Sequence, residues 1–142
     1  MIGIVLAAHG PLPKALLESC DMILGELPQV TTVSLMPGDS LEGLVDRLRE
    51  AAETVESGQG VLVLLDMFGG TPANATAMLS QQRDHLAAVT GASLPMLLET
   101  FMSRQSSDDL DALATTAVTA GRTGVVNVVE SFNEFRREQS HL

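Results

Sequence analysis

The chain has 142 residues, of which 45% are hydrophobic and 18% charged, and its formal net charge is -10. This length and composition predict one folded domain and argue against a disordered chain. The acidic balance and an aromatic content of only 3% argue against binding to nucleic acid or to an anionic membrane. Every apolar run is too short to cross a bilayer, and the single cysteine, Cys20, suits a reducing compartment, so we expect a cytoplasmic protein.

Short apolar runs rich in branched residues alternate with amphipathic stretches along the chain. Four of these runs predict buried strands, at residues 2–8, 30–35, 61–65 and 86–90. The amphipathic stretches predict helices at residues 13–24, 40–56, 72–79, 94–102 and 108–121. A further apolar run at residues 124–129 predicts a last strand, so that a domain of residues 1–130 is followed by a polar tail, residues 131–142.

The alternation of strands and helices predicts an α/β fold, with a doubly wound, mainly parallel sheet and helices on both faces. We expect the strand order 2-1-3-4, in which strands one and three flank the switch point where such sheets bind ligands. The loops that follow these two strands would then form one crevice. The apolar run Val125–Val129 would be an exposed edge in a monomer, and it therefore predicts a dimer.

Two polar residues, His9 and Asp66, directly follow the first and third predicted strands. Histidine can attack phosphorus through a ring nitrogen, and its protonation changes near neutral pH. A carboxylate that accepts the other ring N–H fixes the tautomer and steadies positive charge on the ring. Taken alone, each residue is more simply a cap on a strand or turn. Their expected position side by side at the switch point favours a catalytic pair.

The stretch Gly69-Gly70-Thr71-Pro72 follows Asp66 and predicts a site for a phosphoryl group. Glycines allow close approach of the backbone, and the start of a helix offers N–H groups and a favourable dipole. Thr71 is the expected N-cap, with Pro72 at the first helical position. The stretch is neither a Walker loop nor a G-x-G-x-x-G motif, and an ordinary strand-to-helix turn is the alternative interpretation.

The other histidines, His85 and His141, are expected far from His9, at the opposite end of the sheet and in the tail. A metal site needs several converging ligands, and only His9 and Asp66 are expected to converge. We therefore expect neither a metal nor a cofactor.

Three motifs together resemble one family. They are Ala7-Ala8-His9-Gly10, Asp66 with Gly69-Gly70-Thr71-Pro72, and Leu94-Pro95-Met96-Leu97-Leu98-Glu99. In this order they resemble the enzyme IIA domain of the mannose-type branch of the bacterial phosphoenolpyruvate-dependent sugar phosphotransferase system. The resemblance covers about residues 1–129 and implies the same doubly wound sheet.

The resemblance also implies roles for individual residues. His9 would accept a phosphoryl group from the phosphocarrier HPr and pass it to a histidine of enzyme IIB. Asp66 would bond the histidine ring, and Gly70 and Thr71 would hold the phosphoryl group. Members of this family are dimers in which the last strand, here Val125–Val129, pairs with the sheet of the partner subunit.

Several alternatives stay open from the sequence. Met67-Phe68 replaces a pair that is often Thr-Trp in sugar-transporting members, and the chain ends soon after the last predicted strand, so a regulatory phosphocarrier without sugar transport is one alternative. A chelatase-like enzyme that inserts a metal also has a His-Gly pair after its first strand, but it needs further ligands nearby. A receiver-like module would use Asp66 as acceptor and expects an acidic cluster where this chain has His9. A plain dimeric binding module is the fourth alternative.

Overall fold

The computed structural model describes residues 1–141. The strands are β1 (Gly3–His9), β2 (Val30–Leu35), β3 (Val61–Leu65) and β4 (Leu86–Val89). The helices are α1 (Leu12–Leu24), α2 (Leu41–Val55), α3 (Thr71–Ser80), α4 (Leu94–Arg104), α5 (Leu110–Thr123) and α6 (Val128–Ser140). Up to the end of α5, each predicted element is present with its ends within two residues of the prediction. In the described part of the chain, every helix lacks the combined length and apolar character that crossing a membrane requires.

The four strands form one parallel sheet in the order β2-β1-β3-β4, which confirms the predicted topology. The two central strands, β1 and β3, are buried along their whole length except for His9, the last residue of β1. Strands covered by helices on both faces are apolar at nearly every position, and this explains the continuous apolar runs in the sequence. Burial therefore ends where the polar residues begin, at the carboxyl edge of the sheet.

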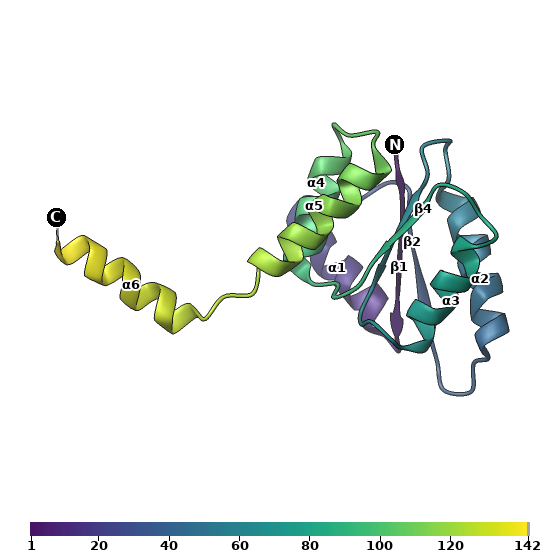
Figure 1. Cartoon of the computed structure of the whole chain (residues 1–142), viewed down its shortest axis with the longest axis horizontal. Coiled ribbons are helices and arrows are strands. Elements are labelled where there is room, and N and C mark those ends of the chain that lie inside the picture. Colours follow the sequence, from purple (N-terminus) through teal and green to yellow (C-terminus); the bar gives the residue numbers. More distant parts are fainter. Residues whose placement is uncertain (142) are drawn as a thin grey trace.

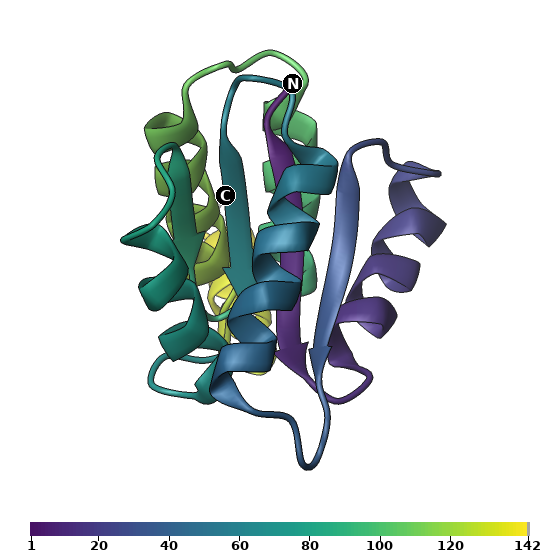
Figure 2. The same cartoon turned by 90° about the vertical axis from the view of Figure 1, so that its right-hand side faces the viewer.

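Helices cover both faces of the sheet, because side chains of each strand point alternately to one face and the other. On one face, Val5 and Ala7 of β1 pack in a core with α2 and α3. On the other face, Ile4 and Leu6 pack with α1, α4 and α5, and Cys20 is a buried member of this second core. Figure 1 shows the two helical layers on either side of the sheet, and Figure 2 shows the strands side by side behind α2 and α3.

Arg104, near the end of α4, holds the amino edge of the sheet together. Its side chain is 2% exposed and donates to the carbonyl oxygens of Ile2 at 3.2 Å, Pro28 at 2.7 Å and Gln29 at 3.1 Å. The guanidinium carbon lies 4.9 Å from the centroid of the Phe101 ring. These contacts tie α4 to the segments that lead into β1 and β2.

The predicted strand at residues 124–129 is wrong for the single chain. Residues 125–127 have no regular structure, and Val128 and Val129 begin α6. Asn127 caps this helix by accepting the N–H of Glu130 at 3.1 Å. A strand needs a neighbouring strand for its backbone hydrogen bonds, and within the described residues the chain leaves the domain after α5 without running beside one (Figure 1).

The residues predicted as a polar tail are therefore largely the helix α6, which projects from the domain as an arm (Figure 1). Leu142, the last residue of the predicted tail, lies outside the described residues.

Candidate functional site

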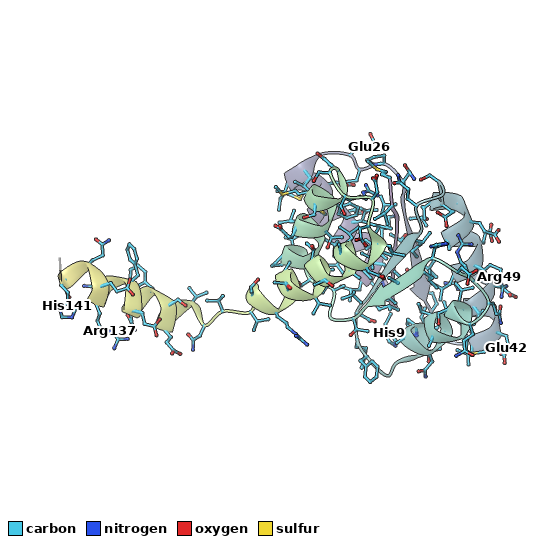
Figure 3. The ribbon with its side chains drawn as sticks, turned by 45° about the horizontal axis from the view of Figure 1, so that its top comes forward. His9, Glu26, Glu42, Arg49, Arg137 and His141 are labelled. Carbon is cyan, nitrogen blue, oxygen red and sulfur yellow. The ribbon has the colours of Figure 1, made fainter. Side chains whose placement is uncertain are left out.

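His9 and Asp66 lie side by side at the carboxyl edge of the sheet. His9 ends β1, Asp66 directly follows β3, and these two strands are paired. The Nδ1 atom of the His9 ring lies 2.8 Å from Oδ2 of Asp66, and the same oxygen accepts the backbone N–H of His9 at 3.1 Å. Figure 3 shows His9 at this edge, on the side of the domain away from Glu26. The strand order thus brings together the two residues that the sequence places 57 positions apart.

Asp66 holds the ring of His9 in one tautomer. Partial burial acts to raise the pKa of Asp66, but hydrogen bonds from the ring and backbone of His9 and from the N–H of Met67 outweigh it. The pKa of this carboxyl is therefore below its ordinary value, and Asp66 is ionised at neutral pH. An ionised carboxylate only accepts hydrogen bonds, so in the neutral form of the ring Nδ1 carries the proton and Nε2 the lone pair.

The ring is the more accessible member of this pair. The side chain of His9 is 45% exposed, whereas that of Asp66 is 13% exposed. Both carboxylate oxygens are already occupied, Oδ2 by the two N–H groups of His9 and Oδ1 by the N–H of Met67 at 2.9 Å. An electrophile from solvent therefore meets Nε2 of His9 before it meets Asp66, which favours His9 over the acceptor role that a receiver-like module would give to Asp66.

Gly70 packs directly against the ring of His9. A Cβ atom added to Gly70 would lie 3.1 Å from Cε1 and 3.7 Å from Nε2 of that ring. The first distance is tighter than nine in ten real Cβ contacts, so a side chain here would require the imidazole to shift by a few tenths of an ångström. Glycine at this position keeps open the space beside Nε2.

The start of α3 differs by one residue from the prediction. Gly70, rather than Thr71, is the N-cap, and Thr71 is the first helical residue. The backbone of Gly70 is extended, and its carbonyl already accepts the first helical N–H, from Asn74 at 3.0 Å. The N–H groups of a first helical turn have no partner within the helix and suit anionic oxygens. In α3 this turn begins beside the ring of His9, and Thr71 brings its hydroxyl to the same turn.

The remaining histidines lie away from the pair. His85 precedes β4 at the amino edge, where its carbonyl accepts the N–H of Val61, and His141 follows α6. Among residues 1–141, no group of three or more His, Cys, Asp or Glu side chains is placed to hold a metal ion. The further ligands that a chelatase-like site needs are therefore not found beside His9 in this part of the chain.

Four exposed apolar side chains lie on the segments that follow β1, β2 and β3 at the carboxyl edge. They are Leu12, Met36, Met67 and Phe68, with exposed fractions of 39, 51, 52 and 86%. We call this group the apolar rim. Sequence reasoning singled out Met67 and Phe68 only, although Leu12 and Met36 also come shortly after strand ends. Exposed apolar groups gathered at a reactive edge are typical of a protein-binding surface.

The fold and the site define a class: a doubly wound α/β domain with an accessible histidine and its carboxylate partner at the switch point of the sheet. Comparison with known proteins then identifies the family. The model of the family described as "PTS system fructose IIA component" matches residues 3–118 of this chain. The chain belongs to the mannose-type enzyme IIA family of the sugar phosphotransferase system.

Individual relatives agree with this assignment. The mannose-specific EIIAB component of Escherichia coli is 35% identical over 124 residues, which are 87% of this chain and 38% of that protein. The fructose-specific EIIA component of Bacillus subtilis is 34% identical over 105 residues, covering 74% of this chain and 72% of that one. The chain thus spans less than two-fifths of the length of the Escherichia coli relative.

Solved structures show the same fold. The EIIA component of Streptococcus agalactiae has a TM-score of 0.84 and 29% identity, covering 92% of this chain and 99% of that one. The mannose/sorbose-specific IIA subunit of Enterococcus faecalis has a TM-score of 0.81 and 30% identity, with 89 and 93% covered. The family match ends at residue 118, so the arm formed by α6 lies beyond it.

Proposed function

We propose that this protein is a phosphohistidine carrier. It receives a phosphoryl group from phospho-HPr on Nε2 of His9 and passes it to enzyme IIB of a sugar phosphotransferase system. The observation that carries this proposal is the 2.8 Å contact between Nδ1 of His9 and Asp66, because it leaves Nε2 as the reactive nitrogen. Membership of the mannose-type enzyme IIA family supports it independently.

In the transfer step, Nε2 of His9 attacks the phosphorus atom of the donor's phosphohistidine in line with the bond that breaks. The new P–N bond forms as the old one breaks, and the donor nitrogen leaves with the bonding electron pair. Asp66 offsets the positive charge that develops on the ring of His9. The first turn of α3, at Gly70 and Thr71, holds the phosphoryl oxygens. Transfer to a histidine of enzyme IIB repeats the same exchange with His9 as the donor.

The surface around His9 supports protein partners for both steps. The apolar rim offers exposed hydrophobic contacts at the same edge as the reacting nitrogen. The net charge of -10 favours partners that carry basic contact patches. The name of the Escherichia coli relative joins an A and a B component in one chain, which supports enzyme IIB as the acceptor.

We also propose that the carrier works as a homodimer. β4 forms an outer edge of the sheet, and the segment after α5 exposes Val125 and Val126 to solvent. Such surfaces favour association of chains.

The experiment that tests the carrier role incubates the purified chain with phosphoenolpyruvate, enzyme I and HPr. We expect an acid-labile gain of one phosphoryl group by mass spectrometry. It should be absent from the His9→Ala variant and retained in the control variant His85→Ala. An unlabelled wild type, or equal labelling of His9→Ala, would overturn the proposal. A base-labile, acid-stable label on Asp66 would instead favour a receiver-like module.

Adding enzyme IIB tests the second transfer. The label should move from His9 to the IIB protein and be regenerated by HPr. Retention of the label on His9 in the presence of every IIB protein of the same cell would contradict this step and favour the regulatory alternative.

A further inference from the structure

The turn that follows β2 lies next to the reactive histidine. His9 and Leu35 are partners in the register of β1 and β2, and the carbonyl of Leu35 accepts the N–H of Gly10 at 2.8 Å. The next residue, Met36, belongs to the apolar rim and is 51% exposed. Figure 2 shows the connection from β2 to α2 extending past the ends of the strands. Whatever fixes this connection therefore fixes part of the surface that a partner meets beside His9.

Residues 36–39 form a β-turn, with Pro37 in second place and Gly38 in third. The N–H of Asp39 donates to the carbonyl of Met36 at 3.1 Å and closes the turn. Gly38 has a φ of +89°, the conformation that the third residue of a type II turn requires. All four residues are exposed, so packing against the core does little to hold the turn. Its position depends on hydrogen bonds to its neighbours.

An ion pair supplies these hydrogen bonds and ties the turn to β2 and α2. Oδ2 of Asp39 accepts the N–H of Met36 at 2.8 Å and an N–H of Arg47, on α2, at 2.9 Å. The other terminal nitrogen of Arg47 donates to the carbonyl of Ser34. The N–H of Met36 and the guanidinium of Arg47 hold the pKa of Asp39 below its ordinary value, so this carboxylate is charged at neutral pH. The pair thus bonds the backbone on both sides of Leu35.

We propose that Asp39 and Arg47 are positioning residues, which hold Met36 where the apolar rim meets the partner protein. This inference rests on the carrier function proposed above and adds two residues that lie outside the reacting groups. Asp66 already holds both the backbone N–H and the ring of His9, so the histidine does not depend on the turn for its position. The ion pair therefore governs the binding of phospho-HPr and not the transfer step.

A direct contact of the two charges with the partner is the alternative, since both side chains are partly exposed. The net charge of -10 favours a partner with basic patches. If the pair met such a partner only as charges, removal of Arg47 would strengthen binding and removal of Asp39 would weaken it. If the pair holds the turn, removal of either side chain weakens binding, because each needs the other to join the turn to α2. The direction of the effect of Arg47→Ala separates the two interpretations.

The first test measures kcat and KM for phospho-HPr in the labelling of His9. We expect KM to rise on the order of fivefold in both Asp39→Ala and Arg47→Ala, with kcat unchanged. The double variant should have the KM of either single variant, because the two side chains act as one unit. The control Arg49→Ala removes the same charge from an exposed pair on the same helix and should not raise KM.

A double-mutant cycle tests whether the pair acts through Met36. Met36→Ala alone should raise KM, and Arg47→Ala added to it should raise KM no further, because the turn then has no large side chain to present. Additive effects would mean that Arg47 reaches the partner directly, which overturns the positioning role.

Amide hydrogen exchange measures the turn in the absence of any partner. The N–H of Met36 should exchange faster in Arg47→Ala than in the wild type or in Arg49→Ala. Unchanged exchange, a lower KM for Arg47→Ala, or a loss confined to kcat would each overturn the inference. In all of these cases, the labelling of wild-type His9 still reports separately on the carrier role.

Discussion

The two edges of the sheet use a nitrogen-bearing side chain in opposite ways. At the amino edge, Arg104 is 2% exposed, and its two terminal nitrogens donate to three backbone carbonyls. At the carboxyl edge, His9 is 45% exposed, and among residues 1–141 only one of its ring nitrogens is engaged, by Asp66. A buried side chain bonded in several directions stabilises the fold, whereas an accessible ring held at one nitrogen leaves the other available for reaction.

Among changes at the two edges, Asp66→Asn should have the largest effect, which is on the rate of phosphoryl transfer. The amide has one oxygen where the carboxylate uses two, so it cannot accept from both His9 and Met67 as Asp66 does. We expect phosphoryl transfer from HPr to slow on the order of 100-fold, because the ring loses its fixed tautomer and its compensating charge. Rapid-quench measurement of the transfer rate checks this. A wild-type rate in a folded variant would remove Asp66 from the mechanism.

Arg104→Ala should affect the amino edge alone. It removes the charged donor from the carbonyls of Ile2, Pro28 and Gln29, and the first of these belongs to a fully buried residue. We expect the free energy of unfolding to fall by about 2 kcal/mol, with the labelling of His9 unchanged in the folded protein. Urea unfolding followed by circular dichroism measures the loss.

Arg49→Ala serves as the comparison for that measurement. Arg49 pairs with the exposed Asp46 at 2.8 Å, and such surface pairs contribute about 0–1 kcal/mol. Equal losses of unfolding free energy in Arg49→Ala and Arg104→Ala would show that burial does not determine how much Arg104 contributes to stability.

Gly70→Ala tests how closely the carboxyl edge is packed around the ring. The added methyl group would lie 3.1 Å from Cε1 of His9 and would displace the ring or the start of α3. We expect a roughly tenfold slower transfer, which corresponds to about 1.4 kcal/mol in the barrier. Thermal unfolding near the wild-type temperature would show that the effect is local. An unchanged rate would mean that the space beside Nε2 is not limiting.

The smallest effect concerns the pH dependence of stability. The pKa of Asp66 is lower in the folded protein than its ordinary value, so the unfolded chain binds the proton more readily. The stability that Asp66 contributes is therefore complete above the ordinary aspartate pKa of about 3.9 and is lost as the pH falls through the lower folded value. The difference in unfolding free energy between wild type and Asp66→Asn should shrink over that range. A difference that is constant with pH would contradict this.

Much of the central fold could be predicted from sequence, because the strands β1 and β3 are buried on both faces and so are continuously apolar. The site could be predicted in part for the same reason: His9 and Asp66 stand out where the apolar runs end. The hydrogen bonds of Arg104 could not be predicted, since their acceptors are backbone carbonyls, which carry no signature in the sequence. The predicted N-cap of α3, Thr71, was one residue too late. In the structure the N-cap is Gly70, whose extended backbone begins the helix without a side-chain hydrogen bond.

The C-terminal segment shows most clearly what could not be predicted from sequence. An apolar run of Val125, Val126, Val128 and Val129 has strand character, yet a strand exists only where another strand accepts its hydrogen bonds. In the single chain no such neighbour runs beside it within the described residues, and Asn127 starts a helix instead.

By itself, the sequence determined the order of strands and helices and the two polar positions where buried strands end, because burial and periodicity are local properties of the chain. Only the tertiary structure decided that His9 and Asp66 touch, that Gly70 lies against the ring, and that Arg104 closes the opposite edge. Each of these contacts joins residues from different elements, and their distances depend on how the whole sheet and its helices pack.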